Sequence, residues 1–230
     1  MKIFETIREA LQDKEVKIVL PEGEEPRILQ ATKRLVNETS ITPVLLGNPE
    51  KIRIYLEIES VTDGYEVIDP QNCSCFEEMV AAFVERRKGK ITEDEARKLL
   101  KEDVNYFGVM LVYLGKVQGM VSGAVHSTAS TVRPALQIIK TLPWVSRTSG
   151  AFLMVRDDER YVFSDCAINI DPDAKTLAEI AINSALTAQI FGIDPKVAML
   201  SYSTKGSGFG EKVDKVVEAT KLAQEMRPDL

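Results

Sequence analysis

Residues 117–134 read Val-Gln-Gly-Met-Val-Ser-Gly-Ala-Val-His-Ser-Thr-Ala-Ser-Thr-Val-Arg-Pro, and this is the most informative stretch of the chain. Its first part, Val117 to Val121, is apolar and predicts a buried strand, while Pro134 to Thr141 predicts a helix. Small and hydroxyl residues fill the loop between them. A strand, a Gly/Ser/Thr loop and a helix in this order are typical of an anion pocket, because the first N–H groups of a helix lack partners within the helix and its dipole favours negative charge there.

The loop offers more ligands than a helix start requires. An ordinary start needs one hydroxyl cap, for example Ser130 or Thr131, with Pro134 in the first turn. Here several hydroxyls can donate hydrogen bonds, and the guanidinium of Arg133 is always charged and presents its donors as a fork. The surplus favours phosphate binding, although Arg133 could instead pair with a surface acid. The candidate ligands in this loop are His126, Ser127, Thr128, Ser130, Thr131 and Arg133.

Composition excludes several classes of protein. The 230 residues are 44% apolar and 28% charged, which suits one large globular domain or two modest ones. A formal net charge of -6 argues against a general nucleic-acid binder. No apolar run approaches the roughly 18 residues of a membrane span, and the amphipathic segment at Met1 lacks the apolar core of a secretory signal. We therefore expect a cytoplasmic protein that binds neither membrane nor nucleic acid.

The cysteines and the single histidine suggest no metal centre. Cys73 and Cys75 are too close together and too isolated for a zinc site, and the three cysteines lack disulfide-scaffold spacing. Cys166 could be a reactive thiol, but its apolar neighbours favour an inert buried cysteine. His126 could be the base of a serine nucleophile, but the nucleophile-elbow spacing is missing and a hydrogen-bonded loop residue is the plainer interpretation. No resident metal or cofactor is predicted.

Short apolar strands alternate with amphipathic helices, which predicts an α/β fold with a mainly parallel sheet. Capping boxes, Ser74 with Glu77 and Thr92 with Glu95, predict two further helix starts. Besides the opening stretch, the first part of the chain is expected to hold strands at 16–20, 43–46 and 65–68 and helices at 26–37, 49–58 and 106–114.

A domain change is expected near Leu142-Pro143-Trp144, which divides the chain into residues 1–143 and 144–230. The second part predicts a hairpin at 151–163, a helix that ends before Gly192, a strand at Val197 to Leu200 and a helix at 212–226. The chain stops at a helix-to-strand turn whose strand is absent. We therefore expect the second α/β domain to be incomplete.

Two other stretches could bind anions. The basic linker Arg86-Arg87-Lys88-Gly89-Lys90 could supply a second guanidinium, although a solvated charge run is the ordinary interpretation. The loop of residues 201–208 fits neither a P-loop nor a dinucleotide fingerprint. It is either a flexible strand-to-helix loop or a second anion contact through Ser203, Thr204 and Lys205.

Five stretches together resemble the phosphate acetyltransferase family. The resemblance runs through the whole chain, and the sister phosphate butyryltransferases fit less well. It implies two α/β domains with a cleft between them, a fold related to the isocitrate and isopropylmalate dehydrogenases, and a homodimer. The stretches are Leu20-Pro-Glu-Gly-Glu24, Asn105-Tyr-Phe-Gly108, residues 121–141, Asp165-Cys-Ala-Ile-Asn-Ile170 and residues 197–207.

The resemblance implies reversible acetyl transfer between coenzyme A and phosphate, with acetyl phosphate, phosphate, coenzyme A and acetyl-coenzyme A as substrates and no permanently bound cofactor. It implies that Arg133 binds the substrate phosphate, that Arg86 or Arg87 helps, with Arg86 preferred, and that the hydroxyl loop lines the coenzyme A site. Family members carry a further C-terminal segment with a Ser-Arg-Gly stretch and an acidic general base. This chain is therefore expected to be a fragment: an acetyltransferase or butyryltransferase polypeptide, or a non-catalytic module that binds phosphate or coenzyme A.

Overall fold

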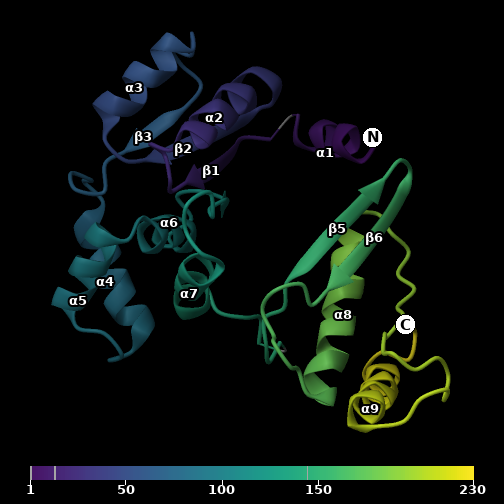
Figure 1. The fold of residues 1–230 in the computed structure, drawn as a ribbon. Helices are drawn as coiled ribbons and strands as arrows, with labels where there is room; N and C mark the ends of the chain where they lie inside the picture. Colours follow the sequence, from purple (N-terminus) through teal and green to yellow (C-terminus); the bar gives the residue numbers. More distant parts are fainter. Residues whose placement is uncertain (1, 13, 144) are drawn as a thin grey trace. The chain divides into compact units, whose positions relative to one another are not determined.

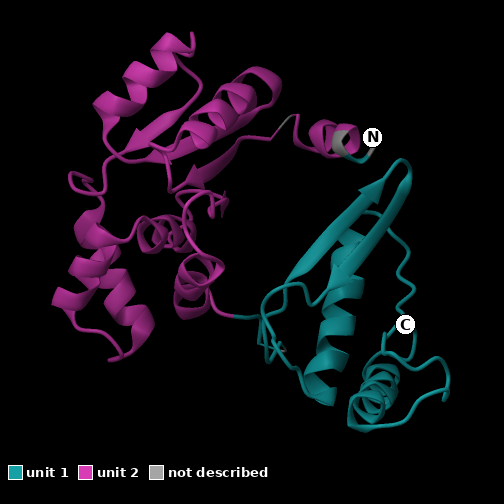
Figure 2. Cartoon of the chain, viewed as in Figure 1, with its two compact units in different colours: residues 1–4, 141–230 teal, residues 5–140 magenta. Residues whose placement is uncertain are grey.

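The computed structural model describes residues 2–12, 14–143 and 145–230 (Figure 1). The chain divides into two compact units, one of residues 5–140 and one of residues 1–4 with 141–230 (Figure 2). The predicted domain boundary between residues 143 and 144 falls at Trp144, which lies outside the described residues, so that boundary stays a prediction. No helix in the described part of the chain has both the length and the apolar character needed to cross a bilayer.

A four-stranded parallel sheet forms the centre of the unit of residues 5–140. Its strand order is β3-β2-β1-β4. Val19 of β1 pairs with Val44 of β2 on one side and with Met120 of β4 on the other. The carboxyl ends of all four strands therefore lie at the same edge, and the predicted parallel α/β fold is confirmed. The strands are β1 Val16–Leu20, β2 Ile41–Leu46, β3 Glu66–Ile68 and β4 Gly119–Met120.

Helices cover both faces of this sheet. Neighbouring residues of a strand point to opposite faces, so consecutive apolar residues pack against different helices. Leu20 and Leu45 pack against α2 and α3, whereas Val19 and Val44 pack against the cluster that contains Phe107 of α6 (Figure 1). Helix α6 is apolar nearly all round and lies in the core. The helices are α1 Lys2–Leu11, α2 Pro26–Glu38, α3 Pro49–Ile58, α4 Phe76–Arg87, α5 Glu93–Glu102, α6 Val104–Tyr113 and α7 Thr128–Ile138.

One predicted capping box forms and the other does not. Thr92 and Glu95 make both reciprocal bonds at the start of α5. The prediction of a capping box at Ser74 and Glu77 is wrong. The N-cap of α4 is Cys75, one residue after Ser74, and no side chain makes a cap bond there. The carboxylate of Glu77 instead makes two 2.6 Å bonds to the guanidinium of Arg97. A bidentate charged pair is stronger than a neutral cap bond, which explains the outcome.

The helix predicted to start at Pro134 begins six residues earlier. The hydroxyl of Ser127 accepts a bond from the N–H of Ser130, so Ser127 caps α7 and Pro134 lies inside the helix. A proline inside a helix removes one helical hydrogen bond and is usually unfavourable. Here Pro134 is buried, and the Ser127 cap determines where α7 begins. Arg133 consequently stands in the second turn of α7, not at the start of the helix.

The unit with residues 141–230 contains a hairpin and two helices, and its core is thin. The predicted hairpin is confirmed, with β5 Ala151–Arg156 antiparallel to β6 Glu159–Ser164, and the helices are α8 Ala174–Ile190 and α9 Glu211–Met226. The strand predicted at Val197 to Leu200 is wrong, since that stretch has no regular structure and pairs with no strand in the described part of the chain. A mainly parallel sheet is therefore not found among the described residues of this unit. Its buried cluster consists of three alanines, Ala178, Ala181 and Ala223.

We expect the α6 core to dominate the stability of the unit of residues 5–140. Phe107 is fully buried, so Phe107→Ala should lower the free energy of unfolding by about 3–5 kcal/mol. The matched control is Ile58→Ala, because Ile58 is 76% exposed and its truncation should change that free energy by less than about 0.5 kcal/mol. Urea unfolding measures both variants. Equal losses of unfolding free energy in the two variants would contradict a core centred on Phe107.

Candidate functional site

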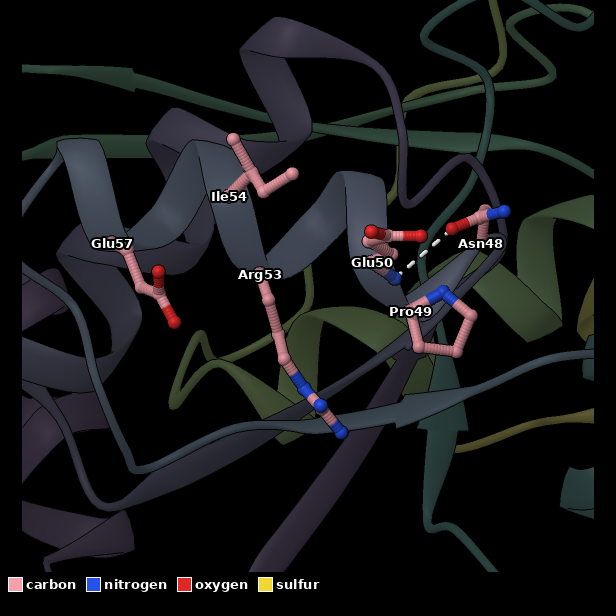
Figure 3. Close-up of a pocket in the computed structure, with 6 residues that line it drawn as sticks. All are labelled: Asn48, Pro49, Glu50, Arg53, Ile54 and Glu57. Carbon is pink, nitrogen blue, oxygen red and sulfur yellow. Dashed lines mark hydrogen bonds between the residues drawn. The ribbon is translucent and has the colours of Figure 1, made fainter.

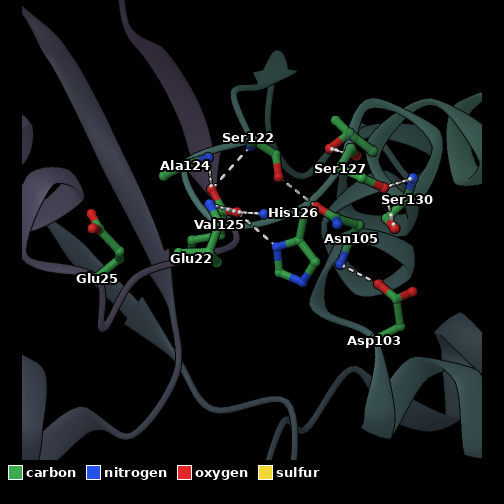
Figure 4. A network of polar contacts seen from close by, with 12 residues as sticks. Glu22, Glu25, Asp103, Asn105, Ser122, Ala124, Val125, His126, Ser127 and Ser130 are labelled. Atoms are coloured by element: carbon green, nitrogen blue, oxygen red, sulfur yellow. Dashed lines mark hydrogen bonds and ion pairs between the residues drawn. The ribbon is translucent and has the colours of Figure 1, made fainter.

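Two loops meet between β1 and β4, because β2 and β3 follow β1 on one side of the sheet and β4 lies on the other side. The loop of residues 21–25 follows β1, and the loop of residues 121–127 follows β4, the neighbour of β1 on the side away from β2. Open parallel sheets bind their ligands outside the carboxyl ends of the strands at such a point. We therefore take this edge of the sheet as the candidate functional site (Figure 4).

A buried carboxylate from the first loop holds the second loop together. The Glu22 side chain is 1% exposed. Its oxygens accept bonds from the N–H groups of Gly123 (3.0 Å), Ala124 (2.7 Å), Val125 (2.8 Å) and His126 (2.9 Å), and from Nδ1 of His126 (2.7 Å). A carboxylate has about four lone-pair positions, so Glu22 has no capacity left for a further ligand.

The charge of Glu22 is stabilised by these bonds. Burial alone would raise the pKa of its carboxyl group, but the bonds from Val125, His126 and Ala124 lower the pKa to about 2. Glu22 is therefore ionised at neutral pH. The loop N–H groups that could bind a substrate anion at residues 123–126 are already occupied by this internal anion.

Two other contacts anchor the same loop. Nη2 of Arg27 donates to the carbonyl of Ala124 at 2.6 Å, and the hydroxyl of Ser122 donates to Oδ1 of Asn105 at 2.6 Å. Asn105 is fully buried, and its own N–H donates to Asp103, the N-cap of α6. The loop is thus tied to α2 through Arg27 and to α6 through Asn105, and Figure 4 shows the contact of Ser122 with Asn105.

The predicted hydroxyl ligands mostly shape the start of α7. The hydroxyl oxygens of Ser127 and Ser130 are 2.9 Å apart, and the hydroxyl of Thr131 donates to the carbonyl of Ser127 at 3.2 Å. Thr128 is exposed, and its hydroxyl bonds nothing in the described part of the chain. The capping interpretation thus accounts for three of the four hydroxyls, while Thr128 and the first-turn N–H groups of Thr128 and Ala129 remain open to a ligand.

The two arginines at the end of α4 play different parts. Nε and Nη2 of Arg86 donate to the carbonyls of Ile138 (2.5 Å) and Ile139 (2.8 Å), and its guanidinium lies 5.2 Å from the ring centre of Tyr113. These carbonyls belong to the C-terminal end of α7, where the helix dipole favours a cation. Arg86 is therefore a structural cap of α7.

Arg87 is held less firmly than Arg86. Its Nη1 is 3.5 Å from the carbonyl of Gln137, and its Nε is buried without a partner in the described part of the chain. Gln137 stands one turn after Arg133 on α7 and bonds the hydroxyl of Tyr106. Burial, and then Asp103, raise the pKa of Tyr106, while Arg133 and Arg87 oppose the rise. Arg133 is exposed and makes no hydrogen bond or ion pair with the described residues.

The loop of residues 201–210 is shaped by its own bonds. The hydroxyl of Ser203 bonds both the N–H and the carbonyl of Gly208, and the N–H of Thr204 donates to the hydroxyl of Ser207 at 2.8 Å. Lys205 is exposed, with a left-handed φ of 46°. These three predicted residues belong to the unit with residues 141–230, whereas Glu22 belongs to the unit of residues 5–140.

The remaining observations concern residues that take no part in the Glu22 contacts. Cys73 and Cys75 are joined by a disulfide, a pairing that their spacing did not suggest, and Cys166 is free and partly buried. The described residues contain no cluster of side chains suited to a metal ion. A surface hollow beside α3 contains none of the predicted site residues, and Asn48 there is the N-cap of α3 (Figure 3).

Sequence reasoning missed Glu22, although a signal was present. Glu22 follows the predicted strand at 16–20 by two residues, and Ser122 follows the predicted strand at 117–121 directly. Since carboxyl ends of neighbouring parallel strands share an edge, the two loops could have been expected to meet. Together they define an α/β protein whose polar loops lie at the switch point of a parallel sheet.

The sequence comparisons give the family. Residues 2–230 match the family described as phosphate acetyl/butaryl transferase. The phosphate acetyltransferase of Bacillus subtilis (strain 168) is 52% identical over 229 residues, which are 99% of this chain and 71% of that protein. The phosphate acetyltransferase of Staphylococcus epidermidis (strain ATCC 12228) is 55% identical over 97% of this chain and 68% of its own length. The chain therefore belongs to the phosphate acetyl/butaryl transferase family.

Solved structures agree. A phosphotransacetylase from Streptococcus pyogenes has a TM-score of 0.94 and 56% identity, and the match covers 100% of this chain and 70% of that one. The EutD phosphotransacetylase from Staphylococcus aureus has a TM-score of 0.89 and 52% identity, over 99% and 69% of the two chains. A branched-chain phosphotransacylase from Enterococcus faecalis V583, with a TM-score of 0.57 and 20% identity, shares the fold.

The Glu22 contacts predict a pH-dependent stability. Folding lowers the pKa of the Glu22 carboxyl group from 4.5 to about 2. The stabilisation that the ionised carboxylate gives the fold is therefore complete above pH 4.5 and is lost as the pH falls toward 2. We expect Glu22→Gln to lower the free energy of unfolding by about 3 kcal/mol at neutral pH and by clearly less near pH 3. Glu15→Gln, at an exposed position, is the control for both conditions. Denaturant unfolding across this range measures the difference, and a deficit that does not change with pH would contradict the assigned charge.

Proposed function

We propose that this chain is a phosphate acetyltransferase polypeptide, which transfers an acetyl group reversibly between coenzyme A and phosphate. One observation carries the proposal: two relatives named phosphate acetyltransferase share more than half of their aligned residues with nearly the whole chain. The start of α7 beside the switch point of the sheet supports it, since its open N–H groups give a small anionic substrate a place to bind.

In this reaction the thiolate of coenzyme A attacks the carbonyl carbon of acetyl phosphate, the carbon–oxygen bond breaks and phosphate leaves. Cations beside the phosphate lower the barrier because they stabilise the charge that develops on the leaving oxygens. Binding both substrates in one site supplies much of the remaining acceleration through orientation. We assign the phosphate contacts to Arg133, to Thr128 and to the open N–H groups at the start of α7.

For the second guanidinium we propose Arg87 in place of Arg86. The donors of Arg86 already bond two carbonyls of α7, so binding a phosphate would uncap that helix. Arg87 has a buried, unpartnered Nε, and its charge acts on the same tyrosine as that of Arg133. Two guanidinium groups would suit a dianionic phosphate.

The remaining assignments are proposals of the same kind. Coenzyme A and acetyl-coenzyme A bind as substrates, no cofactor is held permanently, and the protein acts in the cytoplasm as a homodimer. Ser203, Thr204 and Lys205 are proposed as a second anion contact. Acyl chains longer than acetyl are the alternative substrates, in line with the breadth of the family.

Formation of acetyl-coenzyme A from acetyl phosphate and coenzyme A, followed by the absorbance of the thioester, tests the proposal on the 230-residue chain. Turnover with acetyl phosphate, and slower turnover with butyryl phosphate, is the expected result. Faster turnover with butyryl phosphate would make the chain a butyryltransferase. Coenzyme A binding without turnover would overturn catalysis by this chain and leave a binding module.

The two arginines of α4 should differ in their effect on this reaction. Arg87→Ala should lower kcat/KM about 100-fold, because it removes a charged donor aimed at the developing negative charge. Arg86→Ala should lower kcat/KM by less than about 10-fold while it reduces thermal stability through loss of the α7 cap. Steady-state kinetics and thermal melts on both variants decide between them, and the opposite order of kinetic effects would return the role to Arg86.

A further inference from the structure

Three lysines lie where α4 and α7 end. Helices α4 and α7 pack together (Figure 1). The guanidinium of Arg86, near the end of α4, bonds the carbonyls of Ile138 and Ile139 at the end of α7, so the two C-terminal ends lie side by side. The lysines follow these bonded residues directly in the chain and are brought to one place on the unit. This lysine cluster consists of Lys88, Lys90 and Lys140.

The amines of the lysine cluster are free of partners in the fold. All three lysines are exposed, and their side chains make no hydrogen bond or ion pair with the described residues. Cations at the C-terminal end of a helix often serve to cap its last carbonyls. Here Arg86 already bonds the carbonyls of α7, and the lysines bond none in the described part of the chain. Capping therefore does not account for the cluster.

The cations of this region repel one another. The charge of Arg86, followed by desolvation, lowers the pKa of the Lys140 amine below its ordinary value. Lys88, Lys90 and Arg87 lower it further, because like charges nearby disfavour the protonated amine. The fold thus concentrates positive charge at one place in a chain whose net charge is -6. A local field of this kind draws anions toward it from solution.

The cluster also adjoins the guanidinium groups that we assign to the substrate phosphate. Lys88 is the residue after Arg87. Lys140 follows Arg133 by seven residues, which corresponds to about 10 Å along a helix axis. Electrostatic attraction extends over about 10 Å at moderate salt and over about 30 Å at very low salt. An anion attracted by the lysines is therefore brought within reach of the two arginines.

We propose that the lysine cluster attracts the phosphate-bearing substrates, coenzyme A above all, toward Arg87 and Arg133. This inference rests on the proposed function. The lysines act before the chemical step, since they raise the chance that a substrate reaches the site and neither form nor break a bond. Coenzyme A carries a diphosphate and a separate phosphate, so it should respond more strongly than acetyl phosphate, because the attraction grows with the charge of the ligand.

Neutralising the cluster tests this attraction. In the glutamine variant, kcat/KM for coenzyme A should fall about tenfold at an ionic strength of about 20 mM and less than about twofold at about 0.5 M. The corresponding fall for acetyl phosphate at low salt should be about threefold. The losses should lie in KM, because the lysines do not touch the reacting atoms. The glutamine variant combines Lys88→Gln, Lys90→Gln and Lys140→Gln.

Two control variants separate charge at this place from other effects. Arginine at the same three positions keeps the charge and should keep the salt dependence of the wild type. The remote variant removes the same number of charges elsewhere, partly from α2 and α3, which pack on the other face of the sheet. It should keep kcat/KM within about twofold at low salt. Thermal melts check that each variant folds. The remote variant combines Lys14→Gln, Lys33→Gln and Lys51→Gln.

The outcomes distinguish this inference from the proposed function. An active wild type and a glutamine variant with the same kcat/KM at low salt would overturn the attraction and leave the proposed function intact. Equal losses in the remote variant would overturn it too, because net charge and not place would then decide. A wild type without turnover would overturn the proposed function for this chain. Calorimetric titration with coenzyme A then decides the inference: weaker binding by the glutamine variant at low salt would support it, and unchanged or absent binding would overturn it.

Discussion

Five hydrogen bonds converge on one buried carboxylate, and the arrangement of the site depends on them. Glu22 lies just after β1, while its donors lie just after β4, about a hundred residues later in the chain. A buried charge is costly unless it is fully hydrogen-bonded. The loop after β4 meets that requirement by turning four successive N–H groups inward, and its conformation is therefore coupled to the folding of the whole sheet.

The basic residues fall into two groups with different tasks. Arg86 stabilises the C-terminal end of α7 and Arg27 holds the carbonyl of Ala124, so both are structural. Arg133 makes no hydrogen bond or ion pair with the described residues, and Arg87 has a buried Nε without a partner among them. In a chain with a net charge of -6, two cations without acidic partners at this place favour an anionic ligand over a surface ion pair.

Local sequence signals predicted most of the unit of residues 5–140 and fewer features of the remaining unit. Apolar periodicity and N-terminal prolines located α2 and α3 correctly, because these signals act within a few residues. The predicted start of α7 was wrong because Pro134 was placed in the first turn of the helix, although Ser127 was an equally valid N-cap. The strand at Val197 to Leu200 was wrong because an apolar run does not reveal a partner strand. The Glu22 contacts depend on tertiary folding, and local patterns could not supply them.

The occupied loop also limits how this site can bind phosphate. Gly123 to His126 would form an anion-binding concavity if Glu22 were absent, but its donors are saturated by a permanent internal charge. The proposed phosphate contacts, which are Arg133, Arg87 and the start of α7, therefore lie outside this saturated stretch. The rigid part of the loop therefore stabilises the fold through Glu22, and the proposed phosphate contacts are left to groups that the fold does not use for its own hydrogen bonds.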